Sequence, residues 1–186
     1  MKRIAAILTV LFLLAGCSAG SGEIDRAISL RNKLTKSSEM EFDAIITADY
    51  GEKIHKFSMH CSSDALGNVK FTVTDPATIA GISGTVSEEG GKLTFDEEAL
   101  AFELLADGQI APVAAPWILI HTLLGGYLTA CGEDGAGLKI SIDDSYKGDP
   151  LHMDIWTDRD NLPYRGEVLW QGRRILSLVV SNFKIL

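Results

Sequence analysis

The chain has 186 residues, 46% of them hydrophobic, which is enough for one domain with a substantial core. It carries 17 basic and 25 acidic residues, a net charge of −8. An acidic chain lacks the lysine and arginine patches that phosphate backbones require, which argues against nucleic-acid binding. It also lacks the polybasic segments that hold proteins on anionic lipid headgroups.

The N-terminal segment has the pattern of a secretory signal. Lys2 and Arg3 precede an apolar run over residues 4–14 that is too short to span a bilayer, and small residues then lead to a cysteine. The sequence Leu-Leu-Ala-Gly-Cys at 13–17 resembles the lipobox of bacterial lipoproteins. That resemblance implies cleavage before Cys17 and diacylation of its thiol, and two acyl chains hold a protein stably on a membrane. The alternative is an ordinary secretory signal with an incidental cysteine.

The expected organisation is therefore a lipoprotein signal peptide at 1–16, a lipidated tether at 17–22 and a single domain at 23–186. Loss of Lys2 and Arg3 takes the basic count from 17 to 15 against 25 acids, and the net charge from −8 to −10. The expected location is outside the cytoplasm, on the cell membrane or, if the source has one, the outer membrane. The lipid on Cys17 would supply the attachment.

Two further cysteines, Cys61 and Cys131, form an even pair in a compartment that permits oxidation. A disulfide between them would stabilise the domain by roughly 4 kcal/mol in the chain-entropy model. The alternative is two buried thiols that behave as small hydrophobic groups.

An amphipathic helix is predicted at 23–36. Its stripe at helical spacing consists of Ile24, Ala27, Ile28, Leu30, Arg31 and Leu34. Acidic residues in its first turn and Lys33 and Lys36 in its last turn complement the helix dipole.

After this helix the hydrophobic period changes to two. Strands at 40–48, 54–62 and 69–73, joined by tight turns, predict an antiparallel meander that ends at Pro76. Segments 82–87 and 92–95 flank a Glu-Glu-Gly-Gly hairpin signal, and 99–105 is predicted to be a further short strand.

No charged residue occurs from 108 to 132. A membrane span is one interpretation, since a run of about this length can cross a bilayer. Pro112, Pro116 and the pair Gly125–Gly126 interrupt it, however, and leave only 115–124 as an intact helix. A buried helix that is apolar on nearly all sides is the preferred prediction. Four strands follow, at 138–142, 151–155, 164–170 and 175–185.

The sequence contains no catalytic constellation. It has no Gly-x-Ser-x-Gly elbow, and its acidic pairs fall in predicted turns. His152 and Asp154 share one strand face, but a metal site needs further ligands that the sequence does not supply. The tryptophans are expected to pack the core. The prediction is a non-enzymatic protein without metal or cofactor.

Two local segments resemble the LolA/LolB/LppX-like superfamily of lipoprotein carriers. Residues 67–76, Gly-Asn-Val-Lys-Phe-Thr-Val-Thr-Asp-Pro, resemble its strand that starts after glycine and ends at proline. Residues 89–95, Glu-Gly-Gly-Lys-Leu-Thr-Phe, resemble the hairpin that follows. The order of elements agrees as well. An interior arginine ties the lid to the sheet in that family; Lys53 and Lys56 lie near the corresponding region but do not match it.

The resemblance implies an α+β fold, in which a curved antiparallel sheet forms an open half-barrel with an N-terminal helix and the internal apolar helix as its lid. It implies an apolar cavity on the concave face, whose lining is predicted to be Met40, Phe42, Phe57, Met59, Phe71, Trp117, Ile118, Leu123 and Leu124. A dry, ligand-free core is the alternative.

The expected function is a membrane-anchored carrier or sensor of a lipid, an acyl chain or another apolar ligand. The second hypothesis is an envelope structural or assembly adaptor that binds a protein partner.

Overall fold

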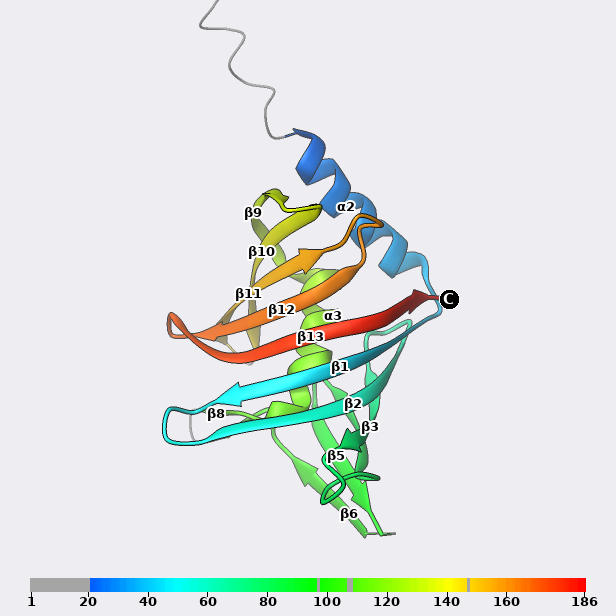
Figure 1. The fold of residues 1–186 in the computed structure, drawn as a ribbon, viewed down its shortest axis with the longest axis vertical. Helices are drawn as coiled ribbons and strands as arrows, with labels where there is room; N and C mark the ends of the chain where they lie inside the picture. The colour runs from blue at the N-terminus through cyan, green and yellow to red at the C-terminus, as the bar shows by residue number, and fades with distance from the viewer. Residues whose placement is uncertain (1–20, 97, 107–108, 147) are drawn as a thin grey trace, which may run out of the picture.

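A computed structural model describes residues 21–96, 98–106, 109–146 and 148–186. The predicted signal peptide, the predicted lipidation site Cys17 and most of the predicted tether lie outside the described residues. The described chain is an open, curved antiparallel sheet of 11 strands with two helices, which confirms the predicted α+β half-barrel (Figure 1).

The sheet consists of two meanders. The first is β1 (Glu39–Asp49), β2 (Ile54–Asp64), β3 (Val69–Asp75), β4 (Ser83–Ser87), β5 (Gly90–Phe95) and β6 (Glu98–Phe102). The second is β9 (Tyr127–Asp134), β10 (Gly137–Tyr146), β11 (Asp149–Thr157), β12 (Pro163–Trp170) and β13 (Arg173–Ile185). Pairing of β1 with β13 joins them, so the strand order is β6-β5-β4-β3-β2-β1-β13-β12-β11-β10-β9.

The link between the two meanders supplies the helix in the concavity. After β6 the chain forms a small hairpin, β7 (Leu105–Ala106) and β8 (Gln109–Ile110), and a 3₁₀ turn at Pro112–Ala114. Helix α3 (Ala115–Gly125) follows and lies inside the curve of the sheet (Figure 1). Pro116 stands in its first turn, where a missing N–H costs nothing, and Gly126 ends it with an extended backbone.

The N-terminal helix, α2 (Ser21–Lys36), crosses one end of the sheet and contacts β9, β10 and α3 (Figure 1). Ala27, Leu30 and Leu34 are buried on its inner face. Lys33 and Lys36 stand in its last turn, as predicted. Neither described helix is long and apolar enough to cross a membrane, and the uncharged stretch divides between β8, the 3₁₀ turn, α3 and the start of β9.

Strand β9 is an element that the sequence analysis did not predict, so five strands follow α3 in the described chain instead of four. It is an edge strand with one neighbour, and its side chains are mostly exposed or half-buried. Its register against β10 also shifts between Ser141 and Ile142. An edge strand of this kind need not alternate apolar and polar residues, which removes the signal that identifies a strand.

Strands β4, β5 and β6 form the outer end of the sheet, which we call the wing. The inward side chains of β5 and β6 continue the apolar face of β3 and β4, because Phe71, Gly84, Leu93 and Leu100 lie opposite one another in register. The wing therefore extends the concave face beyond the part that α3 covers.

Candidate functional site: the lid helix, the groove beside it and the wing

Five of the nine predicted cavity residues lie on β1, β2 and β3, and the other four lie on α3. Eight of the nine are buried and at most 7% exposed: Met40, Phe42, Phe57, Met59, Phe71, Trp117, Ile118 and Leu123. Leu124 is half-buried and packs against Gly67 in the β2–β3 turn. The structure brings all nine into one apolar cluster.

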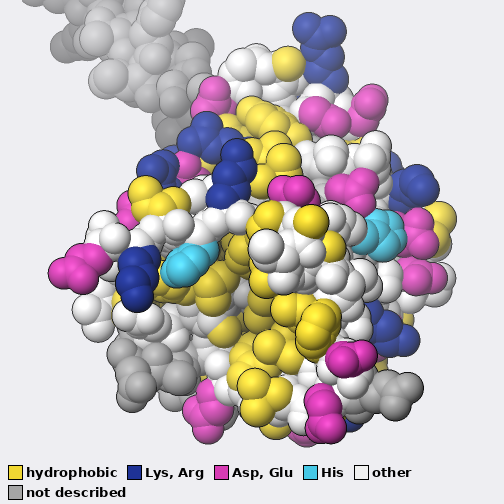
Figure 2. Space-filling view, turned by 60° about the horizontal axis from the view of Figure 1, so that its bottom comes forward, with side chains coloured by type: hydrophobic (Ala, Val, Ile, Leu, Met, Phe, Trp, Pro, Cys, Tyr) yellow, Lys and Arg dark blue, Asp and Glu magenta, His cyan; other side chains and the backbone are white. Residues whose placement is uncertain are grey.

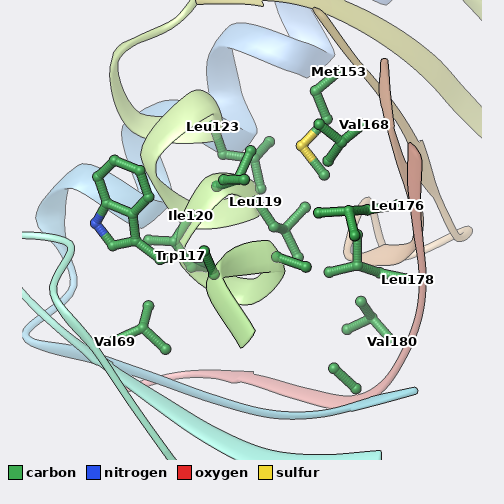
Figure 3. Packing of buried hydrophobic residues seen from close by; sticks show 14 of the residues in the cluster. Val69, Trp117, Leu119, Ile120, Leu123, Met153, Val168, Leu176, Leu178 and Val180 are labelled. Carbon is green, nitrogen blue, oxygen red and sulfur yellow. The ribbon is translucent and has the colours of Figure 1, made fainter. Parts of the chain in front are cut away.

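These residues do not line an open cavity, because side chains of α3 fill the concave face. Figure 3 shows Leu119 directed toward Val168 and Leu176, while Trp117 points the opposite way. The gap at the start of α3, bounded by Leu104, Ile110, Trp117, Ile118, Tyr146, Leu151 and Trp170, measures about 10 Å³. That is about the volume that one water molecule needs. A ligand at the nine predicted residues would therefore have to displace the lid.

The lid is held at its C-terminal end by Arg31 of α2. The Arg31 Nε donates to the carbonyl oxygen of Leu123 at 2.7 Å, and its Nη2 donates to Gly126 O at 2.7 Å and Thr122 O at 3.4 Å. The last carbonyls of a helix have no partners within the helix, so a guanidinium here satisfies several of them and complements the negative end of the dipole.

Arg31 ties the lid to the N-terminal helix, whereas the resemblance implies an arginine that ties the lid to the sheet, near Lys53 and Lys56. Sequence reasoning placed Arg31 in the apolar stripe of that helix and gave it no role. The role of Arg31 could have been inferred from its place in the apolar stripe, since a cation at a core-facing helical position needs a buried partner.

The N-terminal half of the lid carries a cluster of aromatic and polar side chains. Trp117 stacks on His121 with ring centroids 4.5 Å apart and meets Tyr146 edge-on at 5.9 Å. The His121 Nε2 lies 3.5 Å from Asp144 Oδ2, whose side chain is 15% exposed. Trp117 is thus packed on both sides, and His121 is the half-exposed end of the stack.

Beside this cluster opens a groove of about 880 Å³. Trp117 and His121 form its helix side, and the β2–β3 and β4–β5 turns form much of the rest of its lining. Leu66 and Val86 are apolar members of that lining, among serines, a threonine and an asparagine. The groove is therefore amphipathic, whereas the space under the lid is closed and apolar.

Charged groups in the lining are mostly acidic: Glu39, Asp64, Glu88 and Glu89 against Lys70. Burial raises the pKa of Asp64, but hydrogen bonds from the Asn68 side chain and from the backbone of Asn68 and Leu66 outweigh it and leave the pKa lowered. Asp64 is therefore a carboxylate at neutral pH.

The wing presents apolar side chains that the lid does not cover. Leu100 is 65% exposed and Phe95 is 54% exposed, while Leu93 and Phe102 are half-buried against the core. All four share the inward face, because they alternate along β5 and β6 and pair in register. Their alternation was visible in the sequence, but the prediction treated these strands only as a hairpin and a short strand.

Two glycines of the wing leave room for aromatic rings. A Cβ on Gly91 would fall 2.0 Å from the Phe102 ring, and one on Gly84 would fall 2.4 Å from the Lys92 carbonyl oxygen and 2.8 Å from the Phe71 ring. Figure 2, turned toward the end of the molecule that carries β5 and β6, shows hydrophobic side chains gathered in a continuous patch. A patch of this kind on a protein surface commonly marks a binding site.

His152 and Asp154, the residues considered as metal ligands, form hydrogen bonds with neighbouring side chains. The His152 Nδ1 lies 2.6 Å from Asp143 Oδ1, and its Nε2 lies 3.3 Å from Asp154 Oδ1. Within the described residues no group of three or more histidine, cysteine or acidic side chains is placed to hold a metal ion. Asp154 also accepts hydrogen bonds from Ser141 and Lys139, so its surroundings are those of an inter-strand network.

Cys61 and Cys131 are both free thiols in the structure. Cys61 is fully buried on β2, whereas Cys131 lies on the edge strand β9, with its Sγ 3.3 Å from Glu23 O of α2. Burial raises the pKa of each thiol. The candidate disulfide is not formed, because the two strands are separated in the sheet by β1, β13, β12, β11 and β10.

No family model matches the sequence, and no curated protein matches it. The fold is similar to that of a LolA superfamily protein from Nitrosomonas europaea (14% identity, TM-score 0.45, covering 86% of this chain and 93% of that one). It is similar to a putative outer membrane lipoprotein-sorting protein domain from Vibrio parahaemolyticus (7% identity, TM-score 0.47, covering 86% and 91%). It is also similar to the lipoprotein LppX of Mycobacterium tuberculosis (14% identity, TM-score 0.41, covering 87% and 93%). These solved structures of the LolA and LppX kind are similar to the chain in fold.

Proposed function

We propose that this protein is a non-enzymatic, membrane-anchored protein of the cell envelope that binds a lipid or another ligand with an acyl chain. The observation that carries the proposal is the uncovered apolar face of the wing. It continues the concave core in register and borders an amphipathic groove, so one surface offers an apolar track and a polar end.

The wing is a better first docking place than the space under the lid. A chain on the wing covers Leu100 and Phe95, which are otherwise in water, and each methylene buried there contributes about 0.8 kcal/mol. A chain under the lid must first replace the packing of α3 and the hydrogen bonds of Arg31. We therefore propose that the acyl chain docks on the wing with the lid in place, and that deeper entry follows only if α3 moves.

The proposal includes the predicted lipid anchor on Cys17. Helix α2 begins at Ser21, four residues after Cys17. A diacylated Cys17 would keep the domain close to the bilayer, because four residues span at most about 14 Å. The binding surface would then work beside a membrane that supplies lipids.

A probe-binding experiment tests the proposal. The full chain carrying Cys17→Ser, which removes the thiol to be acylated, is titrated with the neutral fluorophore N-phenyl-1-naphthylamine, and dodecyl amphiphiles below their micelle concentration then displace it. We expect saturable binding, and we expect Leu100→Asp to weaken it about tenfold or more, because a carboxylate would have to be desolvated beneath the chain.

Val179→Asp is the matched control. Val179 is 55% exposed, but it lies on the convex face, paired with Ile45 of β1. Equal effects of the two variants, or no saturable binding in the unsubstituted chain, would contradict the proposal.

An adaptor for a protein partner is the second candidate function. Strand β6 ends the sheet in the described part of the chain, so one side of its backbone has no neighbouring strand there and offers a template for strand addition. A purified complex that retains a protein partner but no lipid would favour this candidate.

A further inference from the structure

The charge around the groove and the wing selects the chemical class of the ligand's polar end. We infer, resting on the proposed function, that this end is cationic, as in a long-chain amine or an amine-bearing lipid, and that anionic amphiphiles are discriminated against.

The direction in which an acyl chain would lie follows from the register of the wing strands. Val86 lines the groove, and in register it faces Gly91 of β5. The next apolar pair along the wing is Leu93 with Leu100, and Phe95 lies beyond it. The track from Gly91 to Phe95 is about 13 Å long at strand spacing. An acyl chain on this track therefore places its polar end in the groove.

The polar end of such a chain meets mostly negative charge. The groove lining contains the carboxylates of Glu39, Asp64, Glu88 and Glu89 against the single ammonium group of Lys70 among the described residues. His121, which also lines the groove, faces the Asp144 carboxylate at 3.5 Å. The far end of the track is acidic too, because Glu98 is opposite Phe95. Lys92 lies near the groove end, in register with Thr85 and on the face of β5 opposite to the track.

The groove offers no matching set of donors for an anion. Carboxylate and phosphate groups are bound by arginine forks, lysines or helix N-termini. Among the described residues, the groove lining contains no arginine. Helix α3 reaches the groove through the side chains of Trp117 and His121. An amine, in contrast, finds carboxylates and serine and asparagine oxygens, and a site lined by one sign of charge raises the local concentration of the opposite ion.

The experiment compares three amphiphiles that share a dodecyl chain: dodecylamine, monododecanoylglycerol and dodecanoate. Each displaces N-phenyl-1-naphthylamine from the full chain carrying Cys17→Ser at low ionic strength and again in about 0.5 M salt. We expect dodecylamine to bind tightest and dodecanoate weakest. Their affinities should differ about tenfold at low salt, and this difference should become smaller in high salt.

The double variant Glu88→Gln/Glu89→Gln should reduce the difference in affinity between dodecylamine and dodecanoate. Glu52→Gln/Glu133→Gln is the control, since it changes the net charge equally at the exposed β1–β2 turn and on β9, away from the groove. If both double variants reduced this difference in affinity equally, the inference would be overturned. The preference for the amine would then come from the net charge of the protein and not from the groove.

Equal affinities for the three amphiphiles, or preference for dodecanoate, would overturn the inference and leave the proposed function standing. Failure of N-phenyl-1-naphthylamine and of every amphiphile to bind would overturn both.

Discussion

Among single residues, Arg31 is the side chain that connects the two helices. It lies on α2, yet its guanidinium donates to carbonyl oxygens of Leu123 and Gly126 at the end of α3. Hydrogen bonds from a charged donor contribute more than neutral ones, and carbonyls left unpaired in a partly buried site are costly. Arg31 therefore fixes both helices against each other.

Replacing Arg31 by methionine keeps much of the length of the side chain and removes the donors. We expect Arg31→Met to lower the free energy of unfolding by about 1–3 kcal/mol, measured by urea denaturation. Lys33→Met, at an exposed position of the same helix, is the control and should change the stability by less than about 0.5 kcal/mol. Equal losses in both variants would show that the hydrogen bonds of Arg31 contribute nothing specific.

The two free thiols give a second test on single residues. In the folded chain carrying Cys17→Ser, Cys131 should react slowly with a maleimide and Cys61 should not react, because Cys61 is 0% exposed and burial raises the pKa of both thiols. After unfolding without reductant, mass spectrometry should find two labelled thiols. If mass spectrometry found only unlabelled protein, Cys61 and Cys131 would be joined in a disulfide.

Among the elements, helix α3 decides whether the concave face is a cavity or a core. It is a short helix whose side chains are buried almost all round: Ala115, Pro116, Trp117, Ile118, Leu119, Ile120, Thr122 and Leu123. A helix of this kind is unstable free in water, and the central strands of the sheet bury their apolar concave face only where a second layer covers it. The two therefore cover each other.

Truncation of Leu123 measures how firmly the lid is held. Leu123 is 3% exposed, so Leu123→Ala should lower the free energy of unfolding by about 2–5 kcal/mol if the lid is fixed core. Leu66→Ala, at a side chain that is 85% exposed, is the control. A much smaller loss at Leu123, together with tighter binding of an acyl probe, would indicate a lid that moves aside.

Strands β10 and β11 are linked on their convex face by a network whose centre is Asp154. Its side chain is 13% exposed; burial raises its pKa, but hydrogen bonds from Ser141 and Lys139 outweigh this and leave the pKa below its ordinary value of 3.8. A carboxyl whose pKa is lower in the folded state stabilises the fold above its unfolded pKa and loses that contribution as the pH falls.

The free energy of unfolding should therefore decrease as the pH falls below about 4, and Asp154→Asn should reduce that decrease. At pH 7 the same variant should cost about 1–3 kcal/mol, since the carboxylate that accepts hydrogen bonds from Ser141 and Lys139 is replaced by a neutral amide. Denaturation at pH 3 and pH 7 is the measurement, with Glu52→Gln as the control. An unchanged pH dependence in Asp154→Asn would show that other carboxyl groups determine it.

Across the whole molecule, the pairing of β1 with β13 turns two meanders into one sheet and brings the C-terminal strand next to the strand that follows α2 (Figure 1). The backbone N–H of Ser38 donates to Leu186 O, and that of Leu186 donates to Glu39 O. The first strand of the sheet and its last strand are thus held together at the end where α2 joins the sheet.

Cys17→Ser tests the anchor. We expect the substitution to move the protein from the membrane fraction to the soluble fraction, or to leave it unprocessed, because the thiol that carries the diacylglyceryl group is lost. Intact mass of the unsubstituted protein should show the lipid on the residue that becomes the N-terminus. A serine variant that is still cleaved before residue 17 and still bound to membranes would refute the lipobox interpretation.

The amino-acid pattern alone was sufficient for the elements whose two faces differ. Period-two alternation in segments such as 40–48 and helical spacing at 23–36 identify a strand and a helix, because each buries one face. It was the family resemblance that predicted Met40 and Met59 of the sheet and Trp117 of the apolar helix on one concave face; in the structure the three residues belong to one apolar cluster.

Features that depend on contacts between distant segments required the folded chain. Arg31 has a role because α2 crosses the end of α3, and no local pattern contains that crossing. Strand β9 exists because β10 offers it an edge, and the exposure of Leu100 follows from where α3 stops covering the sheet. Hydrophobic periodicity reports which face of an element is apolar, but which surface covers that face, or leaves it open, is set by packing between elements.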